Sequence, residues 1–100
     1  MFYLLKRKSE NQFSIGDKIM VLADFSGVPA GTKGIVSEIY DGGVMVAWIG
    51  IHDKTEQEVI QAMQDGQLAA YRGFLVDGFG GDDLEYLSVM TQTHPKLHAL

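Results

Sequence analysis

The chain of 100 residues contains no cysteine, two prolines and one tryptophan. The lack of cysteine excludes disulfides, thiolate metal sites and cysteine nucleophiles, and we expect a reducing, cytoplasmic location. No apolar run approaches the roughly 20 residues that a membrane-spanning helix needs. The rest of the composition is ordinary for a globular protein, with 46% hydrophobic and 21% charged residues. We therefore expect one small folded domain.

Positive charge is scarce outside the start of the chain. The formal net charge is −5, and residues 13–100 carry five cations against twelve carboxylates, a charge near −7. Proteins that bind nucleic acid draw most of their affinity from lysine and arginine. We expect no nucleic acid partner, unless the basic triplet Lys6, Arg7 and Lys8 acts alone.

The ends of the chain differ from its middle. The four apolar residues Phe2 to Leu5 precede the positive charges, an order that does not fit a secretory signal. We expect a flexible basic segment over residues 1–12, a folded domain over 13–91 and a flexible tail over 92–100.

Three strand patterns fill the first half of the domain, over residues 18–22, 34–40 and 44–49. The first has nearly continuous apolar content, as in a strand covered on both faces or at a barrel corner. Asp41-Gly42-Gly43 predicts a tight type I′ hairpin between the second and third strands, with either Asp41-Gly42 or Gly42-Gly43 as its two-residue loop. A two-residue loop would fix the pairing register of the second and third strands, so that three residues of each strand share one face of the sheet. These are Ile35, Ser37 and Ile39 on the second strand, and Val44, Val46 and Trp48 on the third.

A helix pattern follows the third strand. Thr55-Glu56-Gln57-Glu58 has the spacing of a capping box, and Gly66 is placed to end the helix. The sequence therefore predicts a short helix within residues 55–66.

The last third of the domain alternates strand and turn signals. Residues 68–76 predict a strand, and Asp77 to Gly81 predict a turn because three of the five residues are glycine. Residues 82–87 fit a single helical turn with acids at its positive end, and residues 88–91 fit a last strand that could close the sheet.

Five short strands, a long insert and a helical turn before the last strand resemble the plan of SH3-like β-barrels. The stretch from Gly16 to Val21 is similar to the G-D-x-V-x-V entry of KOW-type barrels, and the stretch from Gly31 to Val36 to their G-x-x-G-x-V strand. A set of small bacterial proteins of unassigned function carries a closer likeness. The matching stretches are residues 27–34 (GVPAGT-x-G), 43–48 (G-[VI]-M-[VI]-A-W), 77–79 (DGF) and 83–87 (E-L-x-[FY]-L). The resemblance implies a mainly β, five-stranded SH3-like barrel with a helical insert between strands 3 and 4.

Sites for chemistry are not evident. GVPAGTK, residues 27–33, is one residue short of a P-loop, reverses its lysine and threonine, and leads into a strand instead of a helix. His94 and His98 have a helical metal-ligand spacing, and His52 or Asp53 would have to complete the site. The acids of residues 77–85 lack the alternating spacing of a calcium loop. We predict no enzyme, no catalytic residues, no metal and no cofactor.

Aromatic residues are the best candidates for contact, because aromatics are enriched at binding hot spots. Trp48, Phe74 and Phe79 fit the core better, whereas Phe25, Tyr40 and Tyr71 fit core and surface equally well. The predicted surface combines the 24–33 loop, the 41–43 hairpin tip and the 54–66 insert. Its candidate residues are Phe25, Val28, Lys33, Tyr40, Asp41, Tyr71, Asp82, Asp83 and Glu85.

Three functions remain open at this point. The first is a non-catalytic module that binds a protein partner. The second is an acidic inhibitor or regulator that occupies the basic nucleic-acid-binding groove of another protein, since the folded domain is strongly acidic. The third is association with RNA or the ribosome, by analogy with KOW-type domains, which would require a basic patch.

Overall fold

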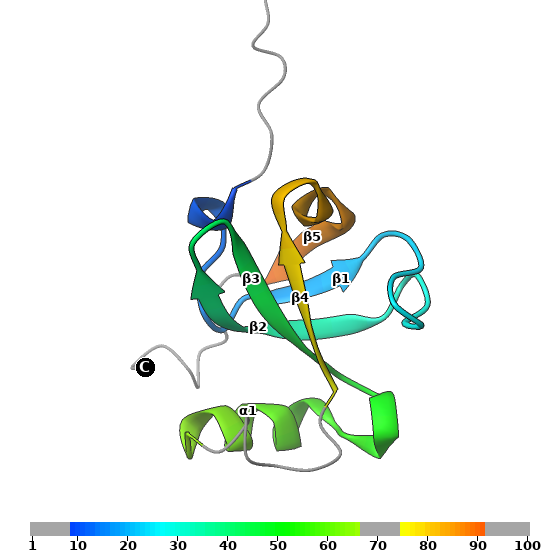
Figure 1. Cartoon of the computed structure of the whole chain (residues 1–100). Helices are drawn as coiled ribbons and strands as arrows, with labels where there is room; N and C mark the ends of the chain where they lie inside the picture. Colours follow the sequence, from blue (N-terminus) through cyan, green and yellow to red (C-terminus); the bar gives the residue numbers. More distant parts are fainter. Residues whose placement is uncertain (1–8, 67–74, 92–100) are drawn as a thin grey trace, which may run out of the picture.

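The computed structural model describes residues 9–66 and 75–91. Their main feature is a single sheet of five antiparallel strands, in the order β4-β3-β2-β1-β5 (Figure 1). The strands are β1 (Lys18–Val21), β2 (Lys33–Tyr40), β3 (Gly43–Trp48), β4 (Val76–Gly80) and β5 (Leu87–Thr91). The protein is therefore mainly β, as predicted from the sequence.

Within residues 9–66 and 75–91, four short helical segments join or flank the strands. They are η2 (Glu10–Gln12), η3 (Ile51–Asp53), α1 (Glu56–Gln64) and η5 (Gly81–Tyr86). The position of α1 between the third and fourth strands confirms the predicted helical insert, and η5 confirms the predicted turn before the last strand. The η2 turn occupies part of the predicted N-terminal segment, where the Gln12 side chain accepts a hydrogen bond from the Ser9 amide.

The sheet is open among the described residues. β5 pairs with β1, β4 pairs with β3, and these two outer strands do not pair with each other. The predicted closure of the sheet by the last strand is not seen in this pairing.

The capping of α1 follows the prediction at both ends of the helix. The Thr55 hydroxyl accepts from the Glu58 amide at 3.2 Å, and the Glu58 carboxylate accepts from the Thr55 amide at 2.9 Å. Gly66 follows the helix with a positive φ of 69°, which suits glycine. α1 therefore begins and ends where its sequence signals indicate.

The β2–β3 hairpin has the predicted two-residue loop, but its predicted type I′ geometry is wrong. Gly42 has a φ of 91°, whereas Asp41 is not among the described residues with positive φ, and a type I′ turn requires it at both central positions. Ser26 and Gly27, at φ 51° and 86°, have that geometry instead. They lie between Phe25 and Val28, whose amides and carbonyls are paired in both directions at 2.8 Å.

A β-bulge in β2 corrects the predicted register. The pairing with β3 shifts between Val36 and Glu38, and the extra residue is Ser37. Ile39 therefore pairs with Val44 as expected, but Ile35 pairs with Ala47 and lies on the opposite face of the sheet. A single inserted residue has this effect because side chains alternate between the faces of a strand.

The prediction of a turn over the glycine-rich stretch from Asp77 to Gly81 is wrong, because most of this stretch forms β4. Of the predicted strand 68–76, Val76 begins β4 and Leu75 precedes it, whereas residues 68–74 lie outside the described part. Phe79 points into the core, while the alternate positions Gly78 and Gly80 lie against the side chain of Tyr40. A Cβ atom at Gly78 would crowd the Met45 sulfur at 3.2 Å and the Tyr40 hydroxyl at 3.3 Å, whereas one at Gly80 would make only an ordinary contact with Tyr40 at 3.5 Å.

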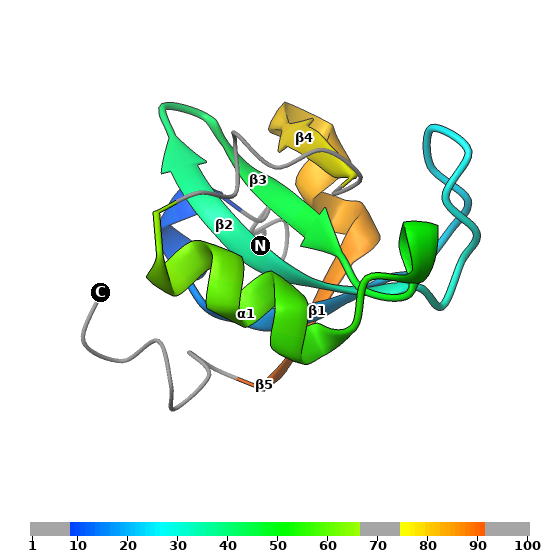
Figure 2. The same cartoon turned by 90° about the horizontal axis from the view of Figure 1, so that it is seen from below.

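The sheet has a packed cluster on each face. The inner cluster contains Trp48, Phe79 and Leu84 together with aliphatic residues from the strands, and these three side chains are at most 1% exposed. The outer cluster joins Ile35 and Ala47 to the buried face of α1. Figure 2 shows α1 crossing β2 on that face. Of the two settings expected for the first strand, cover on both faces does not extend to Leu22, which follows β1 and is 51% exposed.

In the part of the chain that the structure describes, no helix has the length and apolar character needed to span a membrane.

Candidate partner-binding surface

The segment over residues 22–32, between β1 and β2, is a hydrogen-bonded extension of the two strands. At its base the Val21 amide donates to the Thr32 carbonyl at 3.0 Å, and the Gly31 amide donates to the Val21 carbonyl at 2.8 Å. Farther out, the Asp24 carboxylate accepts from the Ala30 amide at 2.8 Å. These bonds and the turn at Ser26-Gly27 hold the loop in a defined conformation.

A chain of aromatic contacts runs from the core to this loop. Trp48 meets Phe79 edge-on with ring centroids 5.9 Å apart, and Phe79 stacks on Phe25 at 4.1 Å. Phe25 then meets Tyr86 at the end of η5, at 5.8 Å. Side-chain exposure rises from one ring of this series to the next, since Trp48 and Phe79 are fully buried, Phe25 is half-buried and Tyr86 is 39% exposed.

Leu22 extends the exposed end of this aromatic chain. Its amide donates to the Tyr86 carbonyl at 2.7 Å, so the two residues are neighbours where β1 and β5 meet. Asp24 and Glu85 are exposed and lie next to these apolar residues in the chain. We call the surface formed by Leu22, Asp24, Phe25, Glu85 and Tyr86 the loop–η5 face.

Several residues predicted from the sequence lie on or beside this face. Phe25 and Glu85 are part of it, and the acids Asp82 and Asp83 lie at the other end of η5. Val28 is only 1% exposed and belongs to the inner cluster, so its side chain offers a partner almost no area in this conformation. Lys33 is exposed at the start of β2.

The hairpin tip lies away from the loop. Lys33 begins β2, and Tyr40 ends it seven residues later; Asp41 follows in the tip. In Figures 1 and 2 the loop and the tip lie at opposite ends of β2, and α1 covers the outer face of the sheet. The three parts of the predicted surface therefore do not form one continuous patch. The tip instead contacts the start of η5, where the Gly81 amide donates to the Gly42 carbonyl at 3.1 Å.

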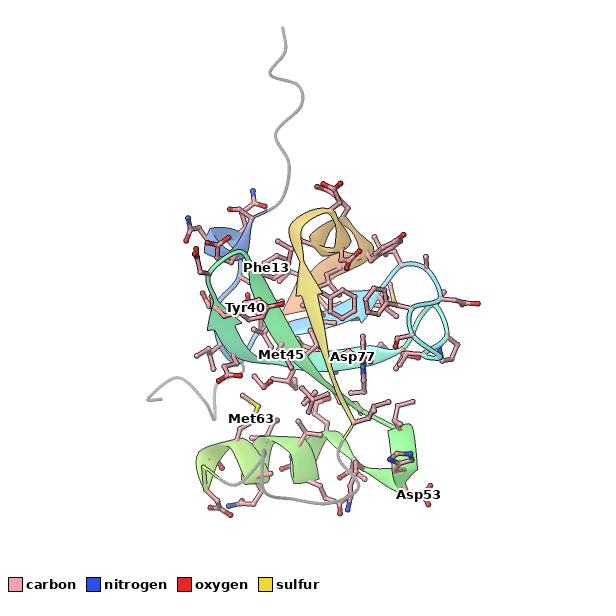
Figure 3. All side chains as sticks on the ribbon, viewed as in Figure 1. Phe13, Tyr40, Met45, Asp53, Met63 and Asp77 are labelled. Atoms are coloured by element: carbon pink, nitrogen blue, oxygen red, sulfur yellow. The ribbon has the colours of Figure 1, made fainter. Side chains whose placement is uncertain are left out.

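Tyr40 covers glycines at the end of the hairpin. A Cβ atom added at Gly43 would lie 2.5 Å from the Tyr40 hydroxyl, and one added at Gly78 or Gly80 would lie 3.3 or 3.5 Å from it. We call Tyr40 and these three glycines the Tyr40 shelf. Figure 3 shows Tyr40 at this end of the sheet and Met63 pointing from α1 toward the same outer face.

Sequence reasoning omitted Leu22 and Tyr86 from its candidate residues. Period-two alternation offered a signal for Leu22, because Ile19 and Val21 are buried and Leu22 falls on the opposite face. Nothing in the sequence marked Tyr86 above the other aromatics. The remaining candidate, Tyr71, lies outside the described residues.

The side chains of residues 9–66 and 75–91 form no group of three histidine, aspartate or glutamate residues that could hold a metal ion. His94 and His98 lie outside these ranges. His52 and Asp53 belong to η3, and Figure 3 shows Asp53 far from Tyr40 and the upper edge of the sheet. The pKa of Glu58 is lowered, chiefly by the hydrogen bond that its carboxylate accepts from the Thr55 amide and then by a side-chain hydrogen bond with Thr55. This shift belongs to helix capping and points to no proton-transfer site.

Comparison of the chain with protein-family models, curated proteins and solved structures found no match.

Proposed function

We propose that this protein is a non-catalytic module that binds a protein partner through the loop–η5 face. One observation carries the proposal: the aromatic chain that starts at buried Trp48 ends in half-exposed Phe25 and exposed Tyr86, beside Leu22 at 51% exposure. Apolar and aromatic side chains held by a rigid core are the usual anchors of protein interfaces. The hydrogen-bonded loop reduces the entropy lost when a partner binds.

The same proposal includes an SH3-like barrel as the scaffold. It is supported by the strand order β4-β3-β2-β1-β5, by η5 directly before the last strand, and by the inner cluster, to which all five strands contribute residues. The resemblance to KOW-type barrels and to small bacterial proteins rests on sequence motifs alone. Since SH3-like scaffolds serve many functions, the binding role depends on the loop–η5 face and not on the fold.

The test is a selection of binding peptides from a random displayed library, using the full chain as bait. Selected peptides are then titrated by fluorescence polarisation against the wild type, Leu22→Ser and the matched variant Met90→Ser. Leu22 and Met90 are similarly exposed, at 51% and 46%, but Met90 lies on β5 outside the face. We expect at least tenfold weaker binding with Leu22→Ser and less than a twofold change with Met90→Ser. Equal effects of the two variants would contradict the proposed face.

A second function is favoured by the charge of the described residues. All thirteen acids of the chain lie in residues 9–66 and 75–91, with only three lysines, a formal charge of −10. An acidic regulator of a nucleic-acid-binding protein would use this charge over a wide area. Its binding would fall steeply with salt and would depend on Asp82, Asp83 and Glu85 more than on Leu22. Charge reversal of these acids therefore separates the two functions.

The third function, association with RNA or the ribosome, would need a continuous basic surface. The described residues supply only Lys18, Lys33 and Lys54, and Lys18 pairs with Glu56 at 2.7 Å. This charge distribution favours the two protein-binding functions.

A further inference from the structure

Charge is divided unevenly between two parts of the chain. The described residues hold every carboxylate side chain and three lysines, whereas the other segments hold five cations and no acid. The described part of the protein thus carries a formal charge of −10. Such a surface attracts basic partners over a distance and repels acidic ones.

The loop–η5 face follows this division at close range. Residues 22–32 and 81–87 include Asp24, Asp82, Asp83 and Glu85 but no lysine, arginine or histidine. Leu22 and Tyr86 supply exposed apolar area within this acidic stretch. A ligand that covered the apolar side chains would also bring its own neighbouring groups close to Asp24 and Glu85.

We infer that the loop–η5 face binds a segment of another polypeptide in which an aliphatic or aromatic side chain stands next to lysine or arginine. This inference rests on the proposed function and names the chemistry of its partner. The apolar side chain of the segment packs on Leu22, Phe25 and Tyr86. Its cation lies near Asp24 or Glu85, and the ring of Tyr86 offers a further attraction to it.

The charge of the face and of the described residues argues against the other occupants. A purely apolar ligand would desolvate the acids of the face without replacing their water, which costs free energy. A second copy of the described fold would bring another charge of −10, and like charges oppose association. Nucleic acid is repelled for the same reason. The chain's own segment over residues 1–8 also places apolar residues, Phe2 to Leu5, next to cations, Lys6 to Lys8. Binding of this segment to the face is therefore one of the outcomes that the test distinguishes.

The experiment uses the peptides selected from the random library by the full chain, together with the unselected library. We expect selected peptides to contain lysine or arginine within two positions of an aliphatic or aromatic residue at least three times as often as unselected ones. Replacing these cations by glutamine should weaken binding at least tenfold in 50 mM NaCl. The double variant Asp24→Asn, Glu85→Gln should bind the original peptides at least fivefold more weakly than the wild type does. Its affinity for the glutamine-substituted peptides should differ from that of the wild type by less than twofold. The double variant Glu38→Gln, Asp41→Asn, which removes two exposed acids outside the face, is the matched control.

The outcomes separate this inference from the proposed function. Leu22→Ser could weaken binding of the selected peptides although these peptides are not enriched in lysine or arginine and their cations can be replaced by glutamine without loss of affinity. In that case the face binds apolar segments and the inference is wrong. If neither Leu22→Ser nor the double variant changes binding, both fail. If the double variant Phe2→Ser, Leu4→Ser, which changes no charge, strengthens peptide binding at least fivefold, the chain's own segment is the occupant and the foreign partner is rejected.

Discussion

Tyr40 and Tyr86 are almost equally exposed, at 41% and 39%, but they lie in different settings. Tyr40 covers the backbone of Gly43, Gly78 and Gly80, whereas Tyr86 continues an aromatic chain to the surface beside Leu22. An aromatic ring over strand glycines replaces the side chains that those glycines lack. Exposure of a ring therefore does not distinguish an aromatic that stabilises a sheet from one that is available to a partner; its neighbours do.

The largest expected effect tests how closely the Tyr40 shelf is packed. Gly43→Ala would place a Cβ atom 2.5 Å from the Phe79 carbonyl oxygen, which belongs to the backbone of β4 and cannot move aside alone. We expect the free energy of unfolding to fall by about 3 kcal/mol, measured by urea denaturation.

Gly42→Ala is the matched control for that change. Gly42 has open space around it, so alanine there meets only the strain of a φ of 91°, about 1 kcal/mol. If Gly43→Ala cost no more than Gly42→Ala, the close approach of β3 and β4 would be refuted.

The next effect separates a structural acid from the acids of the loop–η5 face. The indole N–H of buried Trp48 donates to the Asp77 carboxylate at 2.7 Å. Asp77→Ala leaves this donor without its acceptor, and we expect a loss of about 2 kcal/mol in urea denaturation. In a Trp48→Phe background the same change should cost less than about 0.5 kcal/mol, because no indole donor remains. A full loss in both backgrounds would show that Asp77 stabilises the fold by another contact.

The comparison of the two tyrosine settings is tested directly by Tyr40→Ala and Leu22→Ser. Tyr40→Ala removes the cover of three glycines, so we expect a loss of about 1.5 kcal/mol in stability and unchanged affinity for selected peptides. Leu22→Ser should change stability by less than about 0.5 kcal/mol, as for most surface substitutions, and weaken the peptides. If instead Tyr40→Ala weakened peptide binding in polarisation measurements and Leu22→Ser lowered stability in denaturation measurements, the roles that we assign to the two regions would be wrong.

The sequence predicted those elements whose signals are local. The capping box at Thr55 located α1, and alternation located β2 and β3. The bulge at Ser37 was not predictable, because the extra residue is defined only by its pairing with β3. β4 was mistaken for a turn because Gly78 and Gly80 have turn chemistry. At Gly78 a larger residue would crowd Met45 and Tyr40, which belong to the strands β3 and β2.

The candidate surface was less predictable than the fold. Phe25 was found from its type and its place in a loop, but the value of Leu22 and Tyr86 arises from the contact between the end of β1 and the end of η5. These residues are far apart in sequence, so no local pattern joins them. Conversely, Val28 has the loop position of a contact residue, yet the turn at Ser26-Gly27 directs it into the inner cluster.

The smallest expected effect concerns α1, on the outer face of the sheet that also carries the Tyr40 shelf. The pKa of Glu58 is lowered by its capping bonds with Thr55, so the carboxylate stabilises the folded protein above its unfolded pKa, near about 4.3. This contribution is lost as the pH falls through the lower folded pKa. Glu58→Gln should therefore have a slightly lower Tm than the wild type at pH 7, by less than Gly42→Ala, and the gap should close between about pH 5 and pH 3. Thermal unfolding followed by circular dichroism over that range measures it, and a constant gap would show that the glutamate acts through its shape and not its charge.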